Sequence, residues 1–184
     1  MSKKKKQPVH LSTLKQVTEI TAGARTMFID PGSSGTGWAI FDMPEVMPET
    51  ASPPVMADGI ELETGAWIMR MAQIGEDIPL FCLRYRIVYI VIEWPVLWVG
   101  SKRSLAAAVK LIQLAAACGA IIEAVHLKAE DIMATDILLM TPSEWKGQLG
   151  KKVVDDRIAR AIDLEYPNHV SDAVGMGLAV MGLL

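Results

Sequence analysis

Cysteine is scarce in this chain. Cys82 and Cys118 are the only two among 184 residues, and both lie in apolar stretches. Two isolated thiols provide neither a disulfide framework nor the four ligands of a structural zinc site. The sequence therefore favours a reducing compartment and cysteines that pack as small apolar residues.

A long uncharged apolar run is also missing, although 51% of the residues are hydrophobic. The longest candidate, residues 105–125, contains Lys110, Gln113 and Glu123 and is diluted by alanine. A helix that spans a membrane needs about 20 predominantly apolar residues with few or no charges. We therefore expect a helix rich in small residues and buried in the protein. Packing within the monomer explains those residues, and a contact across a two-fold dimer is the alternative.

Neither sign of charge predominates, because the chain has 18 basic and 21 acidic residues and a net charge of −3. Such a balance does not by itself indicate a nucleic-acid binder, so that function would depend on local basic clusters. Lysines occupy residues 3–6, and no apolar segment follows them, so we expect no secretory signal. We expect residues 1–24 to form a basic, flexible arm with a short helix within residues 11–20, and residues 25–184 to form one domain.

Two apolar runs, residues 26–30 and 36–41, flank a turn that contains Pro31, Gly32 and Gly35. Runs joined by a short loop with glycine predict a β-hairpin. The first run ends on Asp30, and an ionised carboxylate is costly to bury without a partner. Asp30 therefore either begins an ordinary turn or belongs to a site.

The strongest strand pattern, residues 87–93, also ends on an acid. Its continuous β-branched run is typical of a strand covered on both faces, and Pro95 ends the ladder after Glu93. If this strand runs parallel to the first strand of the hairpin, Asp30 and Glu93 meet at one edge of the sheet. Open α/β sheets bind their ligands at that edge.

The other elements complete an alternation of strands and helices. We expect strands at residues 55–62 and 137–140 and helices at residues 64–84, 105–125 and 151–164, with Pro79 bending or interrupting the first of these helices. The last segment, from residue 168 onward, predicts an apolar helix packed on the sheet. Ser171 is a candidate cap for it. Alternatively His169 and Asp172, three residues apart and on one face, already lie in its first turn.

Asp30, Glu93, His169 and Asp172 thus stand at the ends of otherwise apolar elements. Gathered acids raise each other's pKa, and a divalent cation removes that conflict. Carboxylates suit Mg²⁺ or Mn²⁺, and two ions about 3.5–4 Å apart support phosphoryl displacement. The imidazole fits Mn²⁺ too and is a candidate general base. Each residue singly has an ordinary alternative as a turn, ion-pair or cap residue, but the four together favour a metal site.

These residues lie in segments that resemble the RuvC family of Holliday junction resolvases. The match runs from about residue 26 to the C-terminus and keeps the order of the motifs, whereas the first 24 residues lie outside it. The compact size and residues 145–148 resemble the virus-encoded (bacteriophage) branch. The matching positions, in order, are Asp30, Pro31, Gly32, Thr36, Gly37 and Trp38; Ile92 and Glu93; Thr141, Pro142, Ser143, Trp145 and Lys146; and His169, Asp172 and Ala173.

The resemblance implies an α/β, RNase H-like fold with a five-stranded mixed sheet, its first three strands antiparallel, flanked by helices. It implies a homodimer in the bacterial cytoplasm or a phage-infected cell that nicks four-way DNA junctions symmetrically. Two Mg²⁺ or Mn²⁺ ions and no nucleotide cofactor serve this reaction. By position the catalytic residues and metal ligands are Asp30, Glu93, His169 and Asp172, with Asp30 bridging both ions. Some relatives carry Asp in place of His169, so this imidazole either binds metal or positions a water.

Further side chains near the acids are expected to contact DNA. The family carries an aromatic residue after the second acid that probes the junction centre, and Trp98 is preferred to Trp94 because it lies further into the loop. Core packing is the alternative. Phosphate contacts give affinity without sequence information. They are assigned to Lys102, Arg103, Lys146, Lys151 and Lys152, with solvated surface charge as the alternative.

Other functions stay open beside a junction resolvase. A sugar-kinase or actin-like phosphotransferase also begins with a strand, an Asp-x-Gly turn and a hairpin, but it needs two such domains, and the Walker phosphate-binding pattern is absent here. A nuclease with broader specificity for branched DNA and a non-catalytic protein that binds branched DNA are the remaining alternatives. Binding of ATP would favour the kinase, and failure to bind Mn²⁺ would favour the non-catalytic protein.

Overall fold

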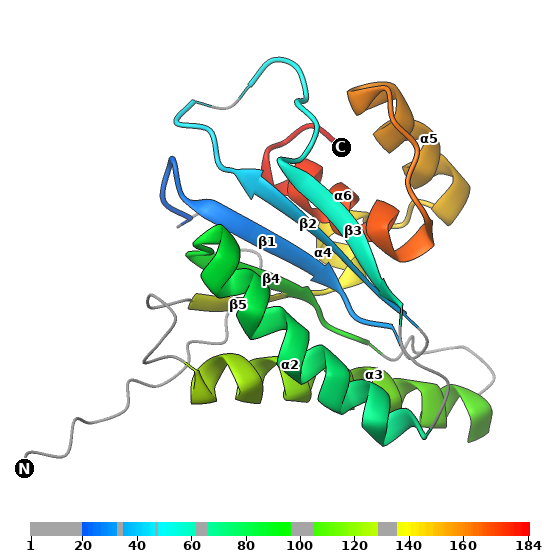
Figure 1. Cartoon of the computed structure of the whole chain (residues 1–184). Coiled ribbons are helices and arrows are strands. Elements are labelled where there is room, and N and C mark those ends of the chain that lie inside the picture. The colour runs from blue at the N-terminus through cyan, green and yellow to red at the C-terminus, as the bar shows by residue number, and fades with distance from the viewer. Residues whose placement is uncertain (1–19, 33–34, 47, 62–65, 97–104, 129–135) are drawn as a thin grey trace, which may run out of the picture.

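The hairpin at the start of the domain is the centre of a five-stranded sheet in the computed structural model (Figure 1). Strands β1 (Arg25–Asp30) and β2 (Gly35–Asp42) are antiparallel, and β3 (Met56–Glu61) pairs antiparallel with β2. On the other side of β1, β4 (Tyr89–Glu93) and β5 (Asp136–Met140) follow in parallel. The order β3-β2-β1-β4-β5 confirms the mixed sheet with three antiparallel strands first.

The structure describes residues 20–32, 35–46, 48–61, 66–96, 105–128 and 136–184. Most of the expected N-terminal arm, with its short helix, lies outside these ranges. Residues 20–24 lie against the domain: Ile20 packs on the core, the amide of Gly23 donates to the carbonyl of Met43 at 2.8 Å, and the hydroxyls of Thr21 and Tyr89 are 2.9 Å apart. The division at residue 24 stays a prediction.

Alternation along the strands divides the core into two layers, one on each face of the sheet. Met27 and Ile29 of β1 belong to the layer beneath two helices, α2 (Trp67–Tyr85) and α3 (Leu105–Leu127). Phe28, between them, belongs to the opposite layer. Both cysteines are buried free thiols in the α2 and α3 layer, as expected.

The opposite face is covered by three helices: α4 (Pro142–Trp145), α5 (Lys151–Ile162) and α6 (Asn168–Val180) (Figure 1). Residues 170–178 of α6 are all buried, so the last helix packs on the sheet as expected. Its N-cap is Pro167, so the alternative of a Ser171 cap is wrong. Helix α2 continues through Pro79, which is buried, so Pro79 does not interrupt it.

Helix α3 is less buried than its composition suggested. Its buried residues lie in its second half, at Ala117, Cys118, Ile121 and Val125, and residues 105–110 are exposed. The expectation of a helix buried within the monomer is therefore wrong for its first half. Of the helices that the structure describes, only α3 is long and apolar enough, by length and composition, to cross a membrane. The first half of α3 thus presents the apolar side chains of Leu105, Val109 and Ile112 to solvent.

Candidate active site

The ends of β1 and β4 bring two carboxylates to one point on the α6 face of the sheet. Ile29 pairs with Ile92 in the parallel ladder, so the next residues, Asp30 and Glu93, are level with each other. Each is two residues beyond a side chain of the α6 layer, Phe28 or Val91, and alternation therefore directs both toward α6. The inference that these two acids meet at one sheet edge is confirmed. The edge is formed by adjacent parallel strands.

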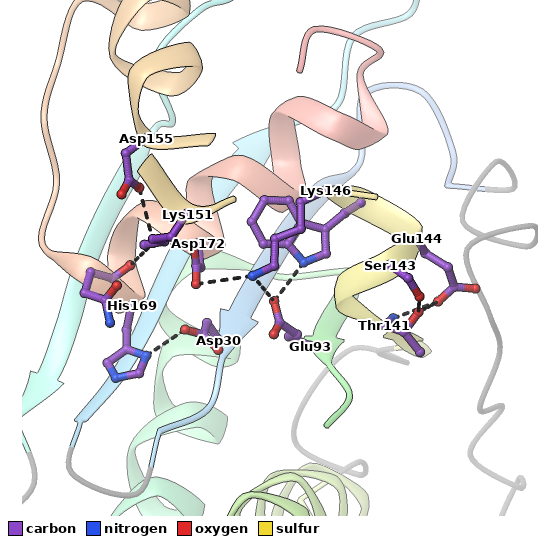
Figure 2. Close-up of polar contacts among 12 residues, drawn as sticks. Asp30, Glu93, Thr141, Ser143, Glu144, Lys146, Lys151, Asp155, His169 and Asp172 are labelled. Carbon is purple, nitrogen blue, oxygen red and sulfur yellow. Dashed lines mark hydrogen bonds and ion pairs between the residues drawn. The ribbon is translucent and has the colours of Figure 1, made fainter. Parts of the chain in front are cut away.

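Helix α6 approaches the hairpin closely enough to bring His169 to Asp30. Nδ1 of His169 is 2.7 Å from Oδ2 of Asp30, a hydrogen bond across 139 residues of sequence (Figure 2). The absence of a side chain at Gly37 makes this approach possible. A Cβ placed on Gly37 would lie 2.1 Å from the carbonyl carbon of His169, whereas one placed on Gly32 would first meet the backbone oxygen of Gly35. Glycine is therefore needed at Gly37 for steric reasons, because the opposing atoms are backbone.

Two lysines lie among the carboxylates (Figure 2). The ammonium of Lys146 is 3.9 Å from Oε2 of Glu93 and 3.7 Å from Oδ2 of Asp172, so it joins β4 to α6. The ammonium of Lys151 donates to Oδ1 of Asp172 and lies 3.2 Å from Oδ1 of Asp155. These contacts place positive charge at the edge of the acidic group, where a phosphate could reach it.

Burial and mutual repulsion set the ionisation of the acids. Burial raises the pKa of Asp30, and its hydrogen bond to His169 opposes this only in part. Burial, followed by the charge of Asp30, raises the pKa of Glu93 to about 7. The hydrogen bond to Asp30 raises the pKa of His169. Burial lowers the pKa of Lys151, but its contacts with Asp172 and Asp155 outweigh that effect and raise it.

The carboxylate oxygens and the imidazole nitrogen of these side chains suit a divalent metal ion, although they are not already arranged around one position. Among the described residues, no three His, Cys, Asp or Glu side chains already stand as a cluster that could hold an ion. The charge of Asp172 nevertheless raises the pKa of both Asp30 and Glu93, which shows that the three carboxylates repel one another. A divalent cation would relieve that repulsion, and carboxylate oxygens are the ligands that Mg²⁺ and Mn²⁺ prefer.

The structure places the other predicted residues unevenly. Lys146 and Lys151 lie beside the acids, whereas Lys152 is 89% exposed and pairs with Asp156 one turn along α5. Trp98, Lys102 and Arg103 lie outside the described residues. The DNA-binding roles of these residues stay predictions, and so do the metal-binding roles of the four candidate ligands.

Two polar partners of the site were not predicted from the sequence. The indole of Trp145 donates to Glu93, and Asp155 accepts from Ser171 at 2.7 Å beside Lys151. The spacing of Lys151 and Asp155, four residues apart on a helix, was the available signal for the second. No sequence pattern separates a tryptophan that binds a carboxylate from one that only fills a core.

The raised pKa values predict that stability falls as the pH rises when no divalent cation is added. Folded Glu93 keeps its proton until about pH 7, whereas its ordinary pKa is 4.5, so the folded state binds more protons between these values. This contribution is complete below pH 4.5 and is lost as the pH rises through about 7, and it amounts to about 3 kcal/mol at most. Asp30 and His169 act with the same sign.

Urea unfolding in a chelating buffer, from about pH 5 to pH 8, measures this effect. The variant Glu93→Gln keeps an acceptor for the Trp145 indole but cannot titrate, so we expect its stability to fall less over this range. Equal falls for the wild type and the variant would contradict the assigned protonation of Glu93.

In this mixed sheet the neighbouring strands β1 and β4 both end on acids, and helix α6 supplies a further acid from one face. This arrangement is the RNase H-like architecture.

No model of a known protein family matches the sequence, and no curated protein matches it. Solved structures do match. RuvC of Thermus thermophilus superposes with a TM-score of 0.61 at 15% identity, over 84% of this chain and 92% of that one.

The structure of T. thermophilus RuvC in complex with a Holliday junction substrate matches with a TM-score of 0.61 at 18% identity, over 85% of this chain and 91% of that one. The yeast mitochondrial Holliday junction resolvase Ydc2 matches with a TM-score of 0.54 at 8% identity, over 91% and 83%. The chain therefore has the RNase H-like fold of RuvC-type resolvases, as the sequence motifs predicted.

Proposed function

We propose that this protein is a Holliday junction resolvase, a metal-dependent endonuclease that makes paired nicks in four-way DNA. The observation that carries this proposal is the convergence of Asp30, Glu93, His169 and Asp172 at one edge of a RuvC-type fold. Neighbours with the same fold are resolvases, and one of them was solved with junction DNA.

In this proposal Asp30, Glu93 and Asp172 hold two Mg²⁺ or Mn²⁺ ions, with His169 as a further ligand or as the group that positions a water. Bound ions would stabilise the charge that develops on the attacking and leaving oxygens of the phosphodiester. The chain itself orients these ligands: His169 fixes Asp30 through Nδ1, and Lys146 lies between Glu93 and Asp172.

The lysines give the site its affinity for DNA backbone. Lys146 and Lys151 present ammonium groups within reach of the carboxylates, and their side chains are 21% and 38% exposed. A DNA phosphate bound beside the acids would lie close to both ammonium groups. Such contacts depend on salt and carry no sequence information.

A nicking assay with matched DNA sequences tests the proposed function. Four-way, three-way and linear substrates are incubated with the full chain and Mg²⁺, or with a chelator. We expect paired nicks in the four-way DNA only when the metal is present. Equal cutting of all three substrates would instead indicate a general branched-DNA or duplex nuclease, and metal-dependent binding without cutting would indicate a scaffold.

We propose further that the enzyme is a homodimer joined through α3. Leu105, Val109 and Ile112 are 82%, 45% and 62% exposed, and their spacing of four and three residues places them on one face of the helix. Gly119 is seven residues after Ile112 and thus on the same face, and a Cβ added there would meet no atom outside its own helix backbone within 4 Å. An apolar stripe that ends in a small residue allows a second copy of the helix to approach closely, and two subunits would supply the two cuts.

Placing a charge in this stripe is therefore expected to separate the subunits. Ile112→Asp should convert a dimer into a monomer with at least a ten-fold weaker association, because an ionised carboxylate would have to be buried in the apolar contact. Sedimentation at several concentrations measures this change. Val153→Asp, at a residue 45% exposed on α5, is the matched control and should remain dimeric. A wild-type monomer, or a dimer that survives Ile112→Asp, would contradict this interface.

A further inference from the structure

Trp145 is a buried aromatic residue whose polar edge faces the candidate active site. It is the last residue of α4 and is 5% exposed. Its indole nitrogen, Nε1, donates a hydrogen bond of 2.7 Å to Oε2 of Glu93. The two residues are 52 positions apart, so this bond joins the segment after β5 to the end of β4.

The surrounding structure holds the indole firmly in place. Helix α4 begins with a capping box, in which the Thr141 amide donates to Oε2 of Glu144 at 2.7 Å. On its other side the ring packs against α6, where a Cβ on Gly175 would lie 2.7 Å from Cζ3 of Trp145. The ammonium of Lys146 lies 4.5 Å from the ring centroid. The ring is therefore packed by α6 and covered by Lys146, which limits its rotation.

The bond restricts the carboxylate of Glu93 in turn. A glutamate side chain has three rotatable bonds, and burial alone does not select one orientation of its carboxylate. The indole donates to Oε2, to which Lys146 is also close, so both contacts of this carboxylate with described side chains fall on one oxygen, and a metal ion would be bound through Oε1. Phenylalanine would fill most of the same space but provide no donor, so the packing and the hydrogen bond can be separated experimentally.

We propose that Trp145 is a positioning residue that orients the Glu93 carboxylate for metal binding, an inference that rests on the proposed function. Groups that hydrogen-bond to metal ligands contribute about 10–100-fold to metal affinity or activity. The competing explanation is that Glu93 merely satisfies a buried indole N–H, which needs some acceptor. In that case the bond would serve the core, and metal binding would not depend on it.

Calorimetric titration of the full chain with Mn²⁺, without DNA, tests this proposal in a double-mutant cycle. The four proteins are the wild type, Trp145→Phe, Glu93→Ala and the double variant. Trp38→Phe is the matched control, because Trp38 is 4% exposed but lies in the core layer under α2 and α3. Thermal unfolding in chelator shows that each variant is folded.

We expect Trp145→Phe to weaken Mn²⁺ binding about ten-fold. The control Trp38→Phe should bind Mn²⁺ like the wild type. When Glu93 is already alanine, Trp145→Phe should have no further effect on Mn²⁺ binding. Unchanged Mn²⁺ affinity in Trp145→Phe would overturn the positioning role. An equal loss in both Glu93 backgrounds would also overturn it, because the indole would then act through packing alone. If the wild type itself binds no Mn²⁺, the proposed function fails instead, and the two failures are thereby distinguished.

Discussion

Replacing Asp30 by asparagine is expected to abolish cleavage of four-way DNA while leaving junction binding within about two-fold of the wild type. Asp30 is 7% exposed, bonds His169 and stands level with Glu93, so it is the most enclosed of the four candidate ligands. Loss of a group that only supports a metal ligand costs about 10–100-fold, so loss of a central ligand should exceed about 100-fold. Asparagine keeps the size of the side chain and removes its charge. Single-turnover cleavage and gel-shift binding measure the two quantities separately.

Asp42→Asn is the matched control for this experiment. Asp42 is an acid at the far end of the same hairpin, where it pairs with Arg25 across the β1–β2 ladder at 2.7 Å. We expect this variant to cleave at the wild-type rate. Cleavage retained by Asp30→Asn would remove the basis for the proposed metal site, and parallel loss in both variants would point to a fault in folding.

Replacing Gly37 by alanine is expected to reduce cleavage about 100-fold or more and to destabilise the protein by about 1–3 kcal/mol. The added Cβ would meet the backbone of His169 and the amide of Val170 within 2.4 Å, and backbone atoms cannot rotate away. The start of α6 must then move off the hairpin, and it would take His169 from Asp30 and Asp172 from the lysines. Urea unfolding and cleavage rates measure the two effects.

Gly59→Ala is the control, because Gly59 is the direct cross-strand partner of Gly37. A Cβ at Gly59 would lie 3.7 Å from the nearest atom, a methyl group of Val170, which is an ordinary contact. We expect this variant to be as stable and as active as the wild type. Similar losses in the two variants would show that glycine is needed for the strands themselves and not for the approach of α6.

Much of this architecture could be predicted from local patterns. The β-branched run before Glu93 and the glycine turn after Asp30 specified two strands and the acid at each end. Their alignment followed once the strands were taken as parallel neighbours, and the structure confirms it. Helix α6 was predictable as apolar, but its depth of approach was not, because that depends on Gly37 meeting a backbone 132 positions away.

The predictions that proved wrong or incomplete concern contacts between segments that are far apart in the sequence. Helix α3 was expected to be buried because its residues are small and apolar, yet its first half is exposed. The composition of a helix shows how much apolar surface it could bury. Only the three-dimensional structure shows how much of that surface the rest of the chain covers. The hydrogen bond from Trp145 to Glu93 was missed for a related reason. Its two partners are ordinary core and strand-end residues until the fold places them together.

The distribution of the four acidic and imidazole groups along the chain has a consequence for biosynthesis. Asp30 and Glu93 belong to early strands, whereas His169 and Asp172 belong to α6, the final helix. A nascent polypeptide that has emerged only as far as β5 therefore lacks half of its candidate ligands. The candidate site would thus be completed only after α6 has emerged and packed on the sheet.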